Sequence, residues 1–236
     1  MFLIVIAIFQ FNVTITNMVT LECYLLKQFH QLSLPSNCFD QLPVEQRSRA
    51  SKLNGKRLQE FYFGRQLLKF ACDQLDTKNI TPPYKIIERE NNAPQLKDSS
   101  GRHLASSISH SSKWLGVVIC HDPNVLHVGI DIETIRDDWS IEKANFFCNQ
   151  QQISEALAIQ DTALRNRFFT TIWAQKEAHF KAGGQHVLNT NSPPINPALL
   201  QTKNVDNTSI MSIYCAHQTM INIQEVSTNG SNFTEK

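Results

Sequence analysis

The stretch "VGIDIE" at residues 128–133 sets two carboxylates side by side on a predicted strand. Branched apolar residues alternate in it with Gly129, Asp131 and Glu133, which is the period-two pattern of a strand with one apolar face. Residues two apart on a strand point to the same side, about 7 Å from each other. A D-x-E pair on a solvated strand face is common, so the role of these two acids depends on a second stretch further along the chain.

That second stretch, "WAQKEAHFKAGG" at residues 173–184, is predicted to end a helix. Trp173, Glu177 and Lys181 follow one another at intervals of four residues, so they line up along one helix face, and Lys176 flanks them. Glu177 and Lys181 would be an ordinary i,i+4 surface pair if the face were solvated. A tryptophan at the head of the row weighs against a solvated face.

Together the two stretches offer three carboxylates, from Asp131, Glu133 and Glu177. Such a set suits a hard divalent cation, and Mg²⁺ typically keeps waters and phosphate oxygens in its remaining octahedral positions. Lys181, one helical turn beyond Glu177, would then face the phosphate. The residues therefore predict a site for magnesium and phosphate.

Three further residues are candidates for binding phosphate. Ser109 and His110, in "SISHSS", precede a predicted strand and could contact phosphate through hydroxyl, imidazole and backbone N–H groups, although a lone histidine is usually structural. Arg65 falls inside an apolar stripe of a predicted helix. It either snorkels past its apolar neighbours or holds phosphate oxygens bidentately at a cleft edge, and residue type alone favours the first.

The elements that must position these residues alternate between strands and helices, which indicates an α+β fold. Strand, helices and strands are followed again by strand, helices and strands, and this repetition predicts two similar halves that meet near residue 123. We expect an N-terminal extension at 1–17, one half at 18–123, a second half with the metal-binding and catalytic motifs at 124–226, and a flexible tail at 227–236.

The individual elements follow from the hydrophobic pattern. We expect strands at 19–26 and 114–120 and a short strand after "TPPYK"; helices lie within 44–75, at 140–160 and at 161–184, the last stopped by Gly183 and Gly184. We also expect a polar loop at 89–102, a hairpin made of "SIMSIYCAH" and "MINIQEV", and fraying from Ser227.

The composition is that of an ordinary globular protein, with 42% hydrophobic residues, 18% charged residues and a net charge of +1. No basic tract argues for nucleic acid or a membrane surface. Six scattered cysteines without metal-ligand spacing fit a reducing, cytoplasmic setting. The apolar start resembles a signal-peptide core but lacks a basic flank and a cleavage site, so we expect a dispensable extension before Met18, with a signal or anchor as the alternative.

These stretches resemble a known family. "SISHSSKW", "VGIDIE" and "FFTTIWAQKEAHFKAGG" resemble, in order and spacing, the three motifs of the 4′-phosphopantetheinyl transferase superfamily, specifically its two-lobed Sfp type. "FYFGRQLLKF" is similar to the helix that precedes them, and the resemblance spans residues 18–226. It implies two pseudo-symmetric α+β halves with the active site in the cleft between them.

The resemblance also implies an activity of the holo-[acyl-carrier-protein] synthase type. The phosphopantetheine arm of coenzyme A would pass to a serine of an apo acyl or peptidyl carrier protein, releasing 3′,5′-ADP, in a cytoplasmic monomer. Mg²⁺ would be held by Asp131, Glu133 and Glu177, with Glu177 and Lys181 as catalytic residues. The positions that match coenzyme A contacts are Arg65, Pro94, Ser109, His110, Asp131 and Lys181.

The chain departs from the family pattern at a few positions. Ala93 stands where a lysine is frequent before Pro94, and His186 and Val187 stand where glycine and leucine are common. These departures bear on affinity and carrier choice more than on the reaction. The alternative function is a non-catalytic member of the fold that binds a carrier protein or a nucleotide. The intact acids favour catalysis, because a retired enzyme would be free to lose them.

Overall fold

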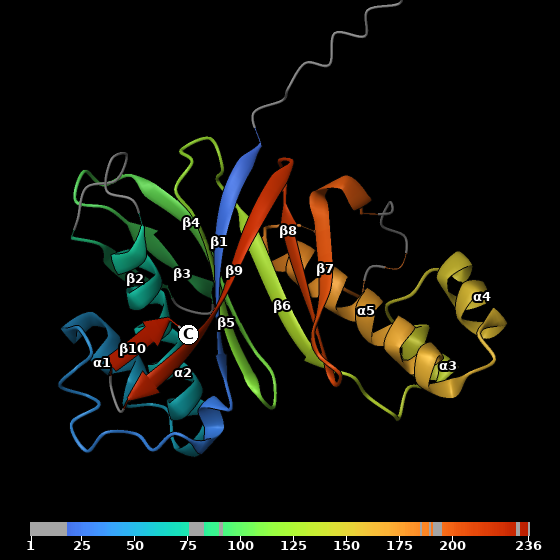
Figure 1. Cartoon of the computed structure of the whole chain (residues 1–236), viewed down its shortest axis with the longest axis horizontal. Helices are drawn as coiled ribbons and strands as arrows, with labels where there is room; N and C mark the ends of the chain where they lie inside the picture. Colours follow the sequence, from blue (N-terminus) through green and yellow to red (C-terminus); the bar gives the residue numbers. More distant parts are fainter. Residues whose placement is uncertain are drawn as a thin grey trace, which may run out of the picture.

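The computed structural model describes residues 18–75, 83–89, 92–184, 186–188, 190, 195–229 and 232–235. They form a mixed α+β structure of four layers: helix α2 (Gly55–Gln74), a seven-stranded sheet, a three-stranded sheet and helix α5 (Thr162–Lys181) (Figure 1). Within the described part of the chain, no helix is both long and apolar enough to span a bilayer. The expected extension at 1–17 lies outside the described residues.

The seven-stranded sheet joins the beginning and the end of the described chain. Its strands, in spatial order, are β10 (Asn232–Glu235), β9 (Thr219–Asn229), β1 (Val19–Lys27), β5 (Trp114–Cys120), β4 (His103–His110), β3 (Asn92–Lys97) and β2 (Lys85–Arg89). β1 pairs in parallel with β9 and antiparallel with β5. The strands predicted at 19–26 and 114–120 are therefore confirmed, and they lie side by side.

The three-stranded sheet has the order β6 (Val128–Thr134), β8 (Ser209–Cys215) and β7 (Leu200–Asp206), all antiparallel. The predicted hairpin of β8 with β9 is wrong, because both edges of β8 are occupied by β6 and β7 while β9 crosses over to β1. The hydrophobic pattern shows that a segment is a strand, but it does not identify the strand's partner.

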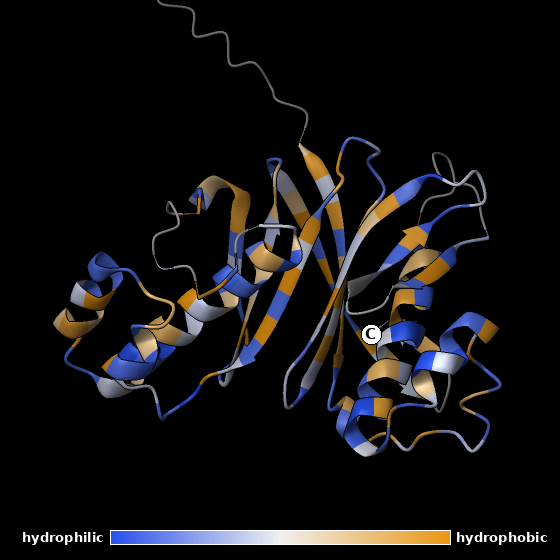
Figure 2. Ribbon diagram, turned by 180° about the vertical axis from the view of Figure 1, so that it is seen from behind, coloured by the Kyte–Doolittle hydropathy of each residue, from blue (hydrophilic) through white to orange (hydrophobic). Residues whose placement is uncertain are grey.

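Two apolar cores explain why the central strands are apolar on both faces. Tyr24 and Leu26 of β1 pack with Phe63 beneath α2, while Leu25 of the same strand packs with Ile130 between the two sheets. Strands buried on both faces have near-continuous apolar sequences rather than alternating ones. Figure 2 shows the apolar bands that recur along these strands and along the flanking helices.

Local signals set the bounds of the helices. Asp161 caps α5 by accepting a hydrogen bond from the backbone N–H of Leu164, and Gly183, at φ 83°, follows its end. The single helix predicted at 140–160 is instead two, α3 (Ile141–Ala144) and α4 (Gln150–Ala158), because a capping box begins α4 at Asn149. The helices predicted within 44–75 are α1 (Val44–Ala50) and α2.

Other expectations need correction. The polar loop predicted at 89–102 contains strand β3, and strand β7 was not predicted. Residues 227–229 continue β9 and 232–235 form β10, so the tail is paired where a frayed segment was expected. Two short 3₁₀ helices, η1 (Phe29–Gln31) and η2 (Pro197–Leu199), complete the described elements. The boundary near residue 123 stays a prediction, although β9 is hydrogen-bonded into the sheet of the earlier segment.

The position of α5 depends on a glycine in β6. A Cβ atom on Gly129 would lie 1.8 Å from the carbonyl oxygen of Ala178 in α5, so no other residue fits between the two backbones. On the opposite face, Gly116 of β5 leaves room for the side chains of Ile130 and Ile132. β6 is thus packed tightly between the large sheet and α5.

We expect Gly129→Ala to destabilise the protein by about 1–3 kcal/mol or more, because the added methyl group must push β6 and α5 apart. Urea unfolding measures the loss. Gly64→Ala in α2 is the matched control, since its Cβ would meet Ile108 at an ordinary 3.5 Å, and alanine favours a helix by about 1 kcal/mol. Equal stability of Gly129→Ala and the wild type would contradict the tight contact.

All six cysteines are free and buried. Burial foremost raises the pKa of the Cys23, Cys72, Cys120 and Cys148 thiols to about 12, and thiolate is the reactive form. We expect a thiol reagent at pH 8 to label none of them in the folded protein and all six after denaturation. Rapid labelling without denaturant would show that a thiol is accessible.

Candidate active site

Two serines of β4 attach the edge of β6 to the large sheet. The backbone N–H of Ile130 donates to Ser107 Oγ at 3.2 Å, and that of Ile132 donates to Ser109 Oγ at 3.1 Å. β6 is an edge strand of its own sheet, so these N–H groups would otherwise lack partners. Ser107 and Ser109, which alternate in "SSISH", therefore provide the hydrogen-bond acceptors that the backbone of a further strand would otherwise provide.

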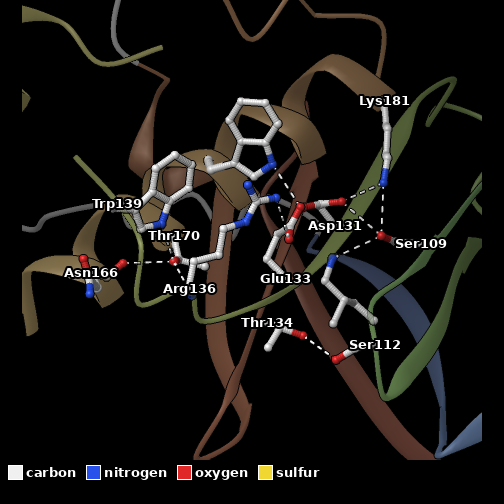
Figure 3. A network of polar contacts seen from close by, with 12 residues as sticks. Ser109, Ser112, Asp131, Glu133, Thr134, Arg136, Trp139, Asn166, Thr170 and Lys181 are labelled. Carbon is white, nitrogen blue, oxygen red and sulfur yellow. Dashed lines mark hydrogen bonds and ion pairs between the residues drawn. The ribbon is translucent and has the colours of Figure 1, made fainter. Parts of the chain in front are cut away.

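Asp131 lies at the centre of the resulting polar network (Figure 3). Its side chain is 6% exposed, and Oδ1 accepts hydrogen bonds from Lys181 Nζ at 2.7 Å and from Ser109 Oγ at 3.0 Å. Oδ2 is buried and has no hydrogen-bond partner among the described residues. A buried carboxylate oxygen without a donor is costly, so this atom is suited to a ligand or an ion.

Glu133 lies two residues further along the same strand face. Its Oε1 accepts a hydrogen bond from Trp173 Nε1 at 2.9 Å, and its Oε2 is 3.8 Å from Arg136 Nη2. Burial, and then the negative charge of Asp131, raise the pKa of Glu133 to about 7, against the opposing effects of Arg136, Trp173 and Lys181. Burial and the charge of Asp131 therefore both destabilise the ionised form of Glu133.

Glu177, on α5, is also affected by the charge of Asp131. Burial, and then the charge of Asp131, raise the pKa of Glu177, while Lys181 and His186 act in the opposite direction. Lys181 binds Asp131 and Ser109 rather than forming the surface pair with Glu177, and no ion pair between Lys181 and Glu177 is found in the described structure. The helix face predicted from four-residue spacing is confirmed as the face that covers β6.

A divalent cation is chemically compatible with these residues. The unpartnered Oδ2 of Asp131 has a lone pair free to bind a cation. Burial, and then the charge of Asp131, raise the pKa of both glutamates, and a bound cation would stabilise their ionised forms. The geometry is less complete, because no group of three histidine, cysteine or acidic residues within the described ranges is arranged to hold a metal ion. The predicted magnesium site therefore stays a prediction.

A pocket of about 690 Å³ shares Lys181 with the polar network of Asp131. It is bounded by α1, α2 and β4, and Lys181 closes its side nearest Asp131. Its charged lining is mainly cationic, with Arg49, Arg57, Arg65 and Lys181 beside one acidic residue, Glu60, and its uncharged polar lining includes Ser107. The His110 ring also lines this cationic pocket. Pro94 also lines it, and its contact with coenzyme A stays a prediction.

The sequence interpretation missed Arg49, Arg57 and Glu60. Arg57 and Arg65 are eight residues apart on one helix, which is the spacing that identified Trp173 and Lys181. The same rule would have found Arg57. Arg49 belongs to α1, and its position at the pocket depends on how α1 packs, which helix periodicity does not predict.

Arg65 agrees fully with neither of its two interpretations. It is only 7% exposed, so the snorkelling interpretation is wrong. Its guanidinium lies over the Phe61 ring and pairs with both oxygens of Glu88, through Nε at 2.5 Å and Nη2 at 2.9 Å. Arg65 lines the pocket, but its strongest contacts are already made within the protein, and a phosphate role stays a prediction.

Ser109 and His110, which are neighbours in the motif, occupy different environments. The Ser109 hydroxyl donates to Asp131 and accepts from Ile132 N–H and Lys181, which uses its full hydrogen-bonding capacity. Ser109 is buried and is absent from the pocket lining, whereas His110 is in it. A direct phosphate contact is therefore favoured for His110 alone.

We expect Ser109→Ala to reduce the free energy of unfolding by about 1–3 kcal/mol. The change removes the acceptor of the Ile132 N–H and one of the two hydrogen bonds that Asp131 Oδ1 accepts. Ser112→Ala is the control, since that exposed hydroxyl bonds only Thr134 among the described residues. Urea unfolding of both variants measures the difference. A loss no larger than that of the control would rule out the anchoring role.

Comparison with known proteins concerns the later part of the chain. Residues 127–231 match the model of the 4′-phosphopantetheinyl transferase superfamily, and a search of curated proteins found no match. The matched segment contains Asp131, Glu133, Glu177 and Lys181, but α2 and β4, with most of the cationic pocket, precede it. The match covers less than half of the chain and indicates a transferase of the phosphopantetheinyl type.

Proposed function

We propose that this protein transfers the phosphopantetheine arm of coenzyme A to a serine of an apo acyl or peptidyl carrier protein, with Mg²⁺, and releases 3′,5′-ADP. One observation carries the proposal: Lys181 both lines the cationic pocket and hydrogen-bonds Asp131. It therefore joins a site suited to phosphates with a site suited to a divalent cation, which is the arrangement that cleavage of a pyrophosphate requires.

The pocket supports a nucleotide with several phosphate groups. Arg57 has no ion pair within the described residues, and His110 is half exposed, so both can bind an anion. The pocket volume of about 690 Å³ falls in the range of small-molecule and cofactor sites. Phosphates bound near Lys181 would bring the pyrophosphate of coenzyme A close to Asp131.

The reaction would exchange one phosphoryl bond for another. The serine oxygen bonds to the β-phosphorus of coenzyme A while the bond from that phosphorus to the 3′,5′-ADP oxygen breaks. Lys181 stabilises or protonates the leaving oxygen, and Glu177, whose pKa is raised by burial, accepts the serine proton. Asp131, Glu133 and Glu177 would hold Mg²⁺, which supplies charge neutralisation at the pyrophosphate.

The proposal includes the architecture of the Sfp type. The two pseudo-symmetric halves would meet across the pocket, with α2 and β4 contributed by one and β6 and α5 by the other. Support comes from the pocket lining, which combines residues 49–110 with Lys181. A single chain would then supply both sides of the cleft, which favours a monomer, and a coenzyme A substrate favours the cytoplasm.

We expect incubation with coenzyme A and Mg²⁺ to add about 340 Da to an apo carrier protein, the mass of the arm joined to a side-chain nucleophile. Intact-mass spectrometry of acyl and peptidyl carriers measures it. Glu177→Gln should abolish the gain, while Glu155→Gln, the same change on the exposed face of α4, should preserve it. No gain on any carrier, with 3′,5′-ADP still bound, would favour the non-catalytic alternative.

We expect Mg²⁺ to raise the unfolding temperature of the coenzyme A complex beyond the effect of coenzyme A alone. A ligand at about a hundred times its Kd adds about 2.7 kcal/mol. Asp131→Asn should lose the additional shift, and Asp161→Asn should keep it, because asparagine caps α5 as well as aspartate does. An undiminished shift in Asp131→Asn would place the cation elsewhere.

A further inference from the structure

Glu60 is the acidic residue of the cationic pocket, and the proposed reaction assigns it no role. Its side chain is 14% exposed, and Oε1 lies 3.6 Å from His110 Nδ1 and 4.0 Å from His30 Nε2. Lys56 Nζ approaches the same oxygen at 3.7 Å from the more exposed side. A carboxylate in a site for anions would repel the ligand, so its placement between two imidazoles requires an explanation.

His30, which faces the carboxylate without a hydrogen bond to it, is fixed by local contacts. The His30 ring lies against the Phe29 ring at an interplanar angle of 39°, with centroids 3.7 Å apart, and its Nδ1 is 3.2 Å from Gln59 Oε1. Gln59 Nε2 also donates to the carbonyl oxygens of His30 and Leu32. η1 is therefore hydrogen-bonded to α2 next to the position from which the Glu60 side chain projects. This contact restricts where the Glu60 carboxylate can lie.

His110 reaches Glu60 because side chains alternate along β4. Ser109 is directed to Asp131 in β6, so the next residue points to the opposite side, towards α2. The His110 side chain is 46% exposed and lines the pocket. With Nδ1 turned to Glu60, Nε2 is the ring nitrogen left to face a ligand.

The charges around His110 make Glu60 decisive for its protonation. The groups that act on the ring are Glu60 and Lys56 from α2, Lys181 from α5 and His30 from η1. Burial foremost lowers the pKa of His110, and Lys181, Lys56 and His30 add to that effect, whereas Glu60 opposes it. Glu60 is therefore the acid that favours the imidazolium form among the groups facing the ring.

We propose that Glu60 is a positioning residue for the nucleotide: its carboxylate, which lies between His30 and His110, directs Nε2 of His110 into the pocket and stabilises the protonated ring that binds a phosphate group. This role rests on the proposed function, since it takes the pocket to be the coenzyme A site. Because Glu60 faces the imidazoles rather than the pocket centre, its benefit through His110 opposes its direct repulsion of the ligand.

The pH dependence of binding separates these two effects. Repulsion by a carboxylate that stays ionised shifts the affinity equally at every pH. An effect through His110 appears only where that ring titrates: the cation is present below its pKa and is lost as pH rises through it. Removing Glu60 lowers this pKa, so the pH range in which acid strengthens binding must move to lower pH.

The test is calorimetric titration with 3′,5′-ADP from about pH 5.5 to 8.5, for the wild type, Glu60→Gln, His110→Gln and Glu45→Gln. The pH dependence that remains in His110→Gln measures the effect of ionisation of the ligand itself. Glu45→Gln is the control, because it makes the same change at an exposed position of α1. After that correction, we expect the increase in affinity between pH 8 and pH 6 to be about two- to fivefold smaller in Glu60→Gln than in the wild type. This is the scale of a partly exposed ion pair.

An NMR titration of the His110 ring gives a second readout that a purely structural role would not move. We expect the pKa of His110 to fall in Glu60→Gln and to stay unchanged in Glu45→Gln. An unchanged pH profile and an unchanged His110 pKa in Glu60→Gln would overturn the positioning role while leaving the coenzyme A pocket in place. If 3′,5′-ADP does not bind the wild type at any pH, the proposed function fails and this role fails with it.

Discussion

The close approach of α5 to β6 at Gly129 determines where the acids and Lys181 of the candidate active site lie. A Cβ at that position would be 1.8 Å from the carbonyl oxygen of Ala178, so the two backbones meet without any side chain between them. Residues 129, 131 and 133 share one face of β6, and α5 covers that face. The carboxylates of Asp131 and Glu133 therefore lie directly beneath the side chains of α5.

β6 is held on all of its sides, which makes it a rigid support for those carboxylates. Its ladder with β8 occupies one edge, and the hydroxyls of Ser107 and Ser109 occupy the other. Ile130 and Ile132 pack against the large sheet where Gly116 leaves room for them. Burial, and then the charge of Asp131, raise the pKa of Glu133 and Glu177, so keeping these carboxylates together costs free energy, and the fixed strand opposes their separation.

The acids and the pocket come from different parts of the chain. The segment that matches the phosphopantetheinyl transferase superfamily supplies Asp131, Glu133 and Glu177, whereas α1, α2 and β4 supply most of the cations. Lys181 is the matched residue that reaches both groups. The proposed nucleotide site therefore depends on residues that precede the match, and Glu60 shows that their charges are balanced against one another rather than uniformly positive.

The sequence by itself determined the local parts of this site. Alternation identified β6 and its two acids, and four-residue spacing identified the face of α5, because both patterns repeat within one element and reflect one buried surface. Only the tertiary structure decided that β9 pairs with β1 instead of β8, that Ser109 is an internal anchor while His110 faces the pocket, and that Arg49, Arg57 and Glu60 gather around it. Those outcomes depend on pairing and packing between segments far apart in the chain, and the periodicity of a segment records that it has a buried face without recording what covers it.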